Sequence, residues 1–146
     1  MFILDTDHVS LWLRGNPAVR VRTAQSVQEV VITIVTVQEI FNGWMGRLNN
    51  LSDLRNLTVE CENLWLTVEF IRSFRVLKFD AAADDCYVQI LQANPPLWKK
   101  RLRQDLRIAA IALSINASVV TRNRRDFEQV PGLAIVDWST TELMGK

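Results

Sequence analysis

Five short apolar runs recur along the chain, and longer segments with helical periodicity separate them. The runs predict strands at residues 1–4, 30–35, 75–79, 118–121 and 134–137. The segments between them predict helices at residues 8–14, 17–28, 36–48, 54–71, 80–93 and 104–116. Strands that alternate with helices predict an α/β fold of three layers, in which helices flank a central, mostly parallel five-stranded sheet.

Two local patterns define the pair of helices in the middle of the chain. Thr36 and Glu39 form a capping-box pattern, so we predict that Thr36 caps a helix and that Glu39 occupies its third position. Further along, apolar residues spaced by three and four form one stripe on a long helix. The stripe consists of Leu54, Leu57, Cys61, Leu64, Val68 and Ile71. The two helices are expected to form an antiparallel hairpin.

The composition is typical of a globular domain, with 49% apolar and 23% charged residues in a chain of 146. We predict a single domain over residues 1–146. No apolar stretch is long enough to span a bilayer, and no export signal is recognisable, so we expect a cytoplasmic protein without membrane partners. Cys61 and Cys86 fall in predicted helices with no metal-ligand partners nearby, which favours reduced thiols in the core.

Four acidic residues fall at strand ends or helix starts: Asp5, Glu39, Asp105 and Asp126. Each of them can also be a helix cap or a surface acid, and for Asp5 the cap has roughly even odds. Ligands of parallel sheets bind beyond the carboxyl ends of the strands, and all four acids belong at that rim. Converging carboxylates cannot all ionise without a cation. Oxygen ligands favour Mg²⁺ or Mn²⁺, and the absence of a His or Cys cluster in the sequence disfavours zinc.

Four segments carry a resemblance to a known family: Phe2–Asp7, Thr36–Gly43, Asp105–Ala110 and Thr121–Phe127. In this order they resemble the successive motifs of PIN-domain ribonucleases, and the closest type is the VapC toxin of bacterial type II toxin–antitoxin pairs. The match spans nearly the whole chain, down to Ile135–Trp138. The family more often has Asn at the position of Asp7. Many members also carry Gly shortly before the third acid, where this chain has Arg101–Gln104.

The resemblance implies a PIN-like fold and a Mg²⁺-dependent endoribonuclease that pairs with a VapB-type antitoxin and forms homodimers. Asp5 and Asp105 would be the main metal ligands, and Glu39 and Asp126 would complete the acidic cluster directly or through water. Residues expected to steady the first turn and orient the carboxylates are Thr6, Thr121 and Asn123. The RNA target (tRNA, rRNA or mRNA) and the number of ions stay open.

Basic residues are concentrated beside two of these acids. Eight of the 17 lie between residues 99 and 125, a window in which Asp105 is the only acid. Seven of them, the basic border, are expected to contact RNA: Lys99, Lys100, Arg101, Arg103, Arg122, Arg124 and Arg125. The alternative is a solvated face whose arginines pair with surface acids such as Glu128 and Asp137. Trp98 either stacks on a base or packs beneath the Pro95–Pro96 loop.

Two other functions compete with this interpretation. Haloacid-dehalogenase phosphatases also begin with an apolar strand followed by a motif like Asp5-Thr6-Asp7, and in such an enzyme Asp5 would be the nucleophile. The Lys and the paired late acids of that family are not well placed here, because Lys78 lies within a predicted strand. A catalytically inactive PIN module that only binds RNA or a partner is the second alternative, and retention of all four acids argues against it. The lone histidine, His8, is expected on a helix surface.

Overall fold

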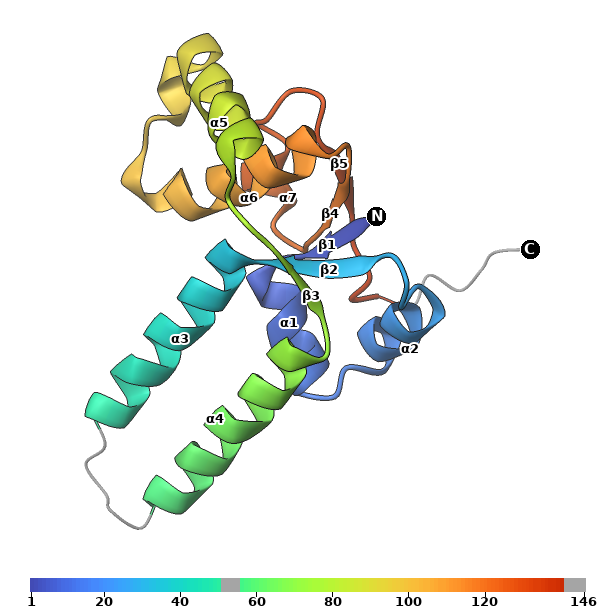
Figure 1. Ribbon diagram of the computed structural model, residues 1–146, viewed down its shortest axis with the longest axis vertical. Coiled ribbons are helices and arrows are strands. Elements are labelled where there is room, and N and C mark those ends of the chain that lie inside the picture. The colour runs from blue at the N-terminus through green and yellow to red at the C-terminus, as the bar shows by residue number, and fades with distance from the viewer. Residues whose placement is uncertain (51–55, 141–146) are drawn as a thin grey trace.

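The computed structural model describes residues 1–50 and 56–140, in which helices cover both faces of a parallel sheet (Figure 1). The strands are β1 (Phe2–Leu4), β2 (Val30–Thr33), β3 (Arg75–Leu77), β4 (Ser118–Val120) and β5 (Ala134–Val136). Their order is β3-β2-β1-β4-β5, and every neighbouring pair is parallel. The predicted three-layer α/β fold is confirmed, and β1 lies between β2 and β4, where the carboxyl ends of three strands meet.

The helices divide between the two faces of the sheet. One face is covered by α1 (Thr6–Leu13), α2 (Pro17–Gln25), α3 (Ile34–Asn49) and α4 (Leu57–Arg72). The other is covered by α5 (Ala81–Ala93), α6 (Arg103–Ser114) and α7 (Arg124–Phe127), with the short 3₁₀ turns η2 (Pro95–Leu97) and η3 (Lys100–Leu102) between α5 and α6. Each face has its own apolar core: Ile3 of β1 packs into one, and the next residue, Leu4, packs into the other. No helix in the described residues is long and apolar enough to cross a membrane.

Helices α3 and α4 run antiparallel as a hairpin, as expected (Figure 1). No described member of the predicted stripe is fully buried: Leu57 is exposed, and Leu64, Val68 and Ile71 are half-buried. The buried residues of α4 are Thr67 and Phe70, and Phe70 packs against Trp12 with ring centroids 4.7 Å apart. Cys61 is exposed and Cys86 is half-buried, so the prediction of two core thiols is wrong for Cys61. The first turns of α4 lie beyond the sheet and have no core to enter, and Leu54 lies outside the described residues.

Helix α3 begins earlier than the sequence pattern predicted. Its N-cap is Thr33, whose Oγ1 accepts a hydrogen bond from the backbone N–H of Thr36 at 3.1 Å. The capping box at Thr36 is therefore wrong, and Glu39 lies in the second turn of the helix. The β-branched residues Ile34 and Val35 were predicted to continue the strand, but the strand ends at Thr33, whose hydroxyl caps the helix. Val35 therefore enters the core from the helix.

Candidate active site

Asp5 lies at the carboxyl end of β1 and is 5% exposed. Its Oδ1 accepts a hydrogen bond from the backbone N–H of Thr6 at 2.7 Å, which makes Asp5 the N-cap of α1. Its Oδ2 accepts a hydrogen bond from the Thr121 hydroxyl at 2.9 Å, just beyond β4. Asp5 is therefore a helix cap through one oxygen, while its other oxygen faces the neighbouring strand, and its role as a metal ligand stays a prediction.

The other three predicted acids come from α3, α6 and α7 and meet neutral donors as well. The Thr6 hydroxyl donates to Glu39 Oε1 at 3.1 Å. The amide Nδ2 of Asn123 lies 3.1 Å from Asp105 Oδ2 and 3.1 Å from Asp126 Oδ2, so one side chain bridges two carboxylates. Each predicted supporting residue contacts at least one of the four acids. Together, Asp5, Glu39, Asp105 and Asp126 are called the acidic cluster below.

Burial and mutual repulsion disfavour ionisation of the inner carboxyls. Burial, followed by the charges of Asp7 and Asp105, raises the pKa of Asp5 to about 7, although hydrogen bonds from Thr121 and Thr6 oppose the shift. Burial also raises the pKa of Asp105 to about 6, with added repulsion from Glu39, Asp126 and Asp7. The pKa of Glu39 is raised by burial, against the hydrogen bond from Thr6. These carboxyls are close enough to repel one another, and the only opposing charge acting on them among the described residues is that of Arg101, which partly lowers the pKa of Asp105.

Asp126 behaves differently from the other three. Burial would raise its pKa, but hydrogen bonds from Arg101 and Asn123 outweigh that effect and lower it. The guanidinium Nη1 of Arg101 lies 2.9 Å from Asp126 Oδ1. Asp126 is thus the one acid of the cluster, among the described residues, whose charge is balanced by a cationic side chain.

The chemistry of this donor set fits a hard divalent cation. Within residues 1–50 and 56–140, no three acidic, His or Cys side chains are already gathered tightly enough to form an ion cage. Instead, hydroxyl and amide groups donate hydrogen bonds to the carboxylate oxygens of Asp5, Glu39 and Asp105. A cation that replaced some of these donors would relieve the repulsion that raises the pKa of Asp5 and Asp105.

A second network beside the cluster was missed by the sequence analysis. His8 is fully buried rather than on a helix surface, and the prediction for it was wrong. Its Nδ1 lies 2.8 Å from Asp7 Oδ1, and its Nε2 accepts the backbone N–H of Trp138 at 3.1 Å. The other oxygen of Asp7 accepts the backbone N–H of Arg122 at 3.1 Å. Asp7 therefore holds His8 of its own helix with one oxygen and joins α1 to the loop after β4 with the other. A single sequence gives no signal for this pairing, because the partners are a neighbouring ring and a distant backbone N–H.

The basic border separates into paired and solvent-facing side chains. Arg122 lies 3.7 Å from Asp7, and Arg124 lies 3.3 Å from Glu128. In the described parts of the chain, the border residues for which no ion pair is formed are Lys99, Lys100, Arg103 and Arg125. Trp98 is 68% exposed, and its ring N–H donates to the Leu91 carbonyl at 2.7 Å, so its ring faces solvent rather than the core.

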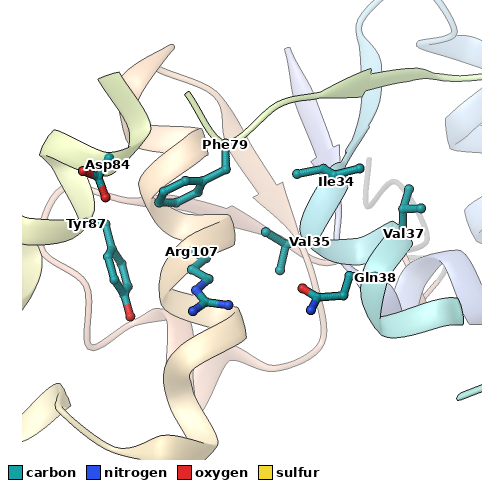
Figure 2. A pocket seen from close by; sticks show the side chains of 8 residues that line it. All are labelled: Ile34, Val35, Val37, Gln38, Phe79, Asp84, Tyr87 and Arg107. Carbon is teal, nitrogen blue, oxygen red and sulfur yellow. The ribbon is translucent and has the colours of Figure 1, made fainter. Parts of the chain in front are cut away.

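Two cavities lie on either side of α3. One, of about 370 Å³, lies between α1, α3 and α4, and Thr6 and Glu39 of the site form part of its wall. The other, of about 480 Å³, lies between α3, α5 and α6 (Figure 2). Its residues are Ile34, Val35, Val37, Gln38, Phe79, Asp84, Tyr87 and Arg107. It contains none of the four acids, so the first cavity is the one continuous with the acidic cluster.

A wholly parallel sheet with acids gathered at its carboxyl edge defines a PIN-like α/β domain. No family model matches the chain. Over 140 residues the chain is 32% identical to the tRNA(fMet)-specific endonuclease VapC of Shigella flexneri, with 94% of this chain and 98% of the relative covered. The protein of the same name from Salmonella typhimurium is 29% identical over 143 residues, with 94% and 97% covered.

Solved structures agree with these relatives. The DNA-bound VapBC complex from Salmonella typhimurium contains a chain with a TM-score of 0.78 and 28% identity, covering 94% of this chain and 97% of that one. FitAcB from Neisseria gonorrhoeae gives a TM-score of 0.69 at 28% identity, with 92% and 96% covered. The chain belongs to the VapC family, whose curated relatives here are named as endonucleases.

Proposed function

We propose that this chain is a metal-dependent endoribonuclease and the toxin of a toxin–antitoxin pair. The observation that carries the proposal is the acidic cluster itself: four carboxylates from separate elements meet at one sheet edge in a member of the VapC family. A phosphatase that uses Asp5 as nucleophile is disfavoured, because Asp5 is 5% exposed and both of its oxygens accept hydrogen bonds.

Asp5 and Asp105 are the proposed ligands of a Mg²⁺ or Mn²⁺ ion, with Glu39 and Asp126 beside them. When bound, such an ion lowers the pKa of a coordinated water and neutralises a phosphate oxygen. The protein's own groups orient the carboxylates: the Thr6 and Thr121 hydroxyls each hold one oxygen of an acid. Asn123 fixes the spacing between Asp105 and Asp126 through its bridging amide.

RNA is the proposed substrate, and tRNA is the candidate class because both curated relatives are named for tRNA(fMet). The solvent-facing members of the basic border lie on the segment that precedes Asp105 and the one that ends at Asp126. Their charge would attract the phosphate backbone toward the acids by screened Coulomb forces. Exposed Trp98, directly before Lys99, offers a ring on which a base can stack.

A VapB-type antitoxin is the proposed partner, because the structural neighbours include VapBC complexes. The cavity between α1, α3 and α4 is the proposed docking place. Its wall includes the apolar side chains of Ile40, Trp44 and Leu66, and it reaches Glu39 of the cluster. A segment bound there would block the acids while covering Leu66, which is 50% exposed. Homodimerisation, which the resemblance implied, stays a prediction.

Cleavage of a labelled tRNA by the purified, antitoxin-free protein tests the enzymatic proposal. We expect cleavage with Mg²⁺ or Mn²⁺, and loss of cleavage when EDTA is added. The matched control is Arg72→Gln, since Arg72 pairs with Glu69 on exposed α4, away from the cluster. This variant is expected to cleave at the wild-type rate. Cleavage that is undiminished by chelation would contradict the proposal.

Co-expression tests the docking place. The experiment co-expresses the short VapB-type reading frame that the proposal predicts beside this gene, and the variant is Leu66→Glu. We expect the variant to stay toxic and to escape neutralisation, because a charge then replaces an exposed apolar side chain in the wall of the cavity. Full neutralisation of the variant would place the antitoxin elsewhere.

A further inference from the structure

Arg101 differs from the rest of the basic border in what it touches. It belongs to η3, directly before α6, and is about half-exposed. Its guanidinium Nη1 points at Asp126 Oδ1 and lies 2.9 Å from it. Among residues 1–50 and 56–140, no other basic side chain pairs with a member of the acidic cluster.

This contact separates Asp126 from the other acids by its charge balance. Asp5, Glu39 and Asp105 receive hydrogen bonds only from hydroxyl, amide and backbone N–H groups among the described residues, and the charge of Arg101 reaches Asp105 without direct contact. Asp126 has one oxygen on a guanidinium and the other on the Asn123 amide. A cation approaching Asp126 must therefore compete with a positive charge that is already in place.

We propose that Arg101 is a resident counter-ion of the acidic cluster, a positioning residue that withholds Asp126 from a divalent ion and thereby weakens ion binding. The inference rests on the proposed function only in taking the cluster as the ion site. Asp5, Glu39 and Asp105 then share the ion, and Asp126 lies outside the set that contacts it. Arg101 thus acts on the ion through Asp126 rather than as one of several phosphate contacts.

A calorimetric titration of Mn²⁺ into the RNA-free protein at pH 8 measures the effect of Arg101 on ion affinity directly. We expect Arg101→Gln to bind Mn²⁺ roughly threefold to tenfold more tightly than wild type, because a carboxylate is freed and a positive charge is removed. Arg101→Lys keeps the charge and should stay within about twofold of wild type. Arg72→Gln removes an arginine from an exposed pair with Glu69 and should leave the affinity unchanged.

The same measurement in an Asp126→Asn background separates this role from general charge repulsion. If Arg101 acts mainly by withholding Asp126, adding Arg101→Gln to Asp126→Asn should raise the Mn²⁺ affinity clearly less than Arg101→Gln does alone, the remainder being the repulsion that Arg101 exerts near Asp105. An equal gain in both backgrounds would overturn the inference, as would an Arg101→Gln protein with wild-type Mn²⁺ affinity. A loss of RNA affinity alone would make Arg101 an ordinary phosphate contact.

RNA cleavage by the same wild-type preparation distinguishes failure of the proposed nuclease function from failure of the counter-ion role of Arg101. If the wild-type protein cleaves RNA with Mg²⁺ and Arg101→Gln leaves the Mn²⁺ affinity unchanged, only the counter-ion role of Arg101 is overturned. A wild-type protein that neither cleaves RNA nor binds Mn²⁺ overturns the proposed function together with it.

Discussion

Replacing Asp5 by Asn should stabilise the ion-free protein while abolishing its activity. The carboxyl of Asp5 has a pKa raised from 3.8 to about 7, first by burial and then by Asp7 and Asp105. An acid whose pKa is raised in the folded protein lowers the free energy of unfolding at pH values above its unfolded pKa, because the unfolded chain loses the proton more easily than the folded one. The cost is absent below pH 3.8, grows as the pH rises toward 7 and is constant above that.

The size of the effect follows from the shift. Three pKa units correspond to about 4 kcal/mol at pH 8, and to about 1 kcal/mol at pH 4.5. The amide of Asn can replace the hydrogen bonds, because its oxygen can accept from the Thr6 N–H and its NH₂ can donate to the Thr121 hydroxyl. We therefore expect about 2–4 kcal/mol of stabilisation at pH 8, since part of the repulsion is relieved by relaxation of the wild type.

Thermal unfolding in EDTA at pH 4.5, 6 and 8 is the assay. The melting temperature of Asp5→Asn should exceed that of wild type by roughly 5–12 °C at pH 8 and by much less at pH 4.5. Added Mn²⁺ should raise the melting temperature of wild type more than that of the variant, because the ion binds only the folded protein. A difference that does not depend on pH, or a variant less stable at pH 8, would refute the electrostatic argument.

Three further outcomes are expected. Asp105→Asn should abolish RNA cleavage while circular dichroism stays native, and cleavage near the wild-type rate would remove Asp105 from the ligand set. Replacing Lys99 and Arg103 with Ala should flatten the salt dependence of RNA binding, measured with Ca²⁺ in place of Mg²⁺, by about one unit of slope per lost phosphate contact. His8→Phe should lower stability to urea by about 1–3 kcal/mol, because the Trp138 N–H loses its acceptor, and wild-type stability would contradict that reasoning.

The sequence predicted the sheet because strands depend on short-range patterns. The residues that contact the four acids were expected only from the family resemblance, since Thr6 and Glu39 are 33 residues apart and Asp5 and Thr121 are 116 apart. Apolar runs marked all five strands, and Asp5, Glu39, Asp105 and Asp126 reach the expected edge through contacts with Thr6, Thr121 and Asn123. The start of α3 was misplaced because Thr33 and Thr36 are equally good caps by residue type. Only the position of β2 in the sheet decides which hydroxyl faces the free N–H groups.

Long-range polar pairs that the family resemblance did not imply could not be predicted. Trp138 lies 130 residues from His8 along the chain, and its backbone N–H carries no sequence signal. Arg101 looked like any other basic residue in its segment, yet it turns toward Asp126, 25 residues away. Partners of this kind are selected by the direction in which the loops leave the sheet, which follows from the fold as a whole.

The backbone of the acidic cluster is part of the hydrogen-bonded ladder between strands. The amide of Asp5 donates to the Val120 carbonyl at 3.0 Å, and the amide of Thr121 donates to the Val136 carbonyl at 2.9 Å. Immediately before them, Ile3 and Leu4 anchor opposite cores. Amide protons at these positions should exchange with solvent only when the whole protein opens, and should be among the slowest in the molecule. Asp5 is consequently carried by the last part of the chain to unfold, whereas Glu39 lies on the helical hairpin itself.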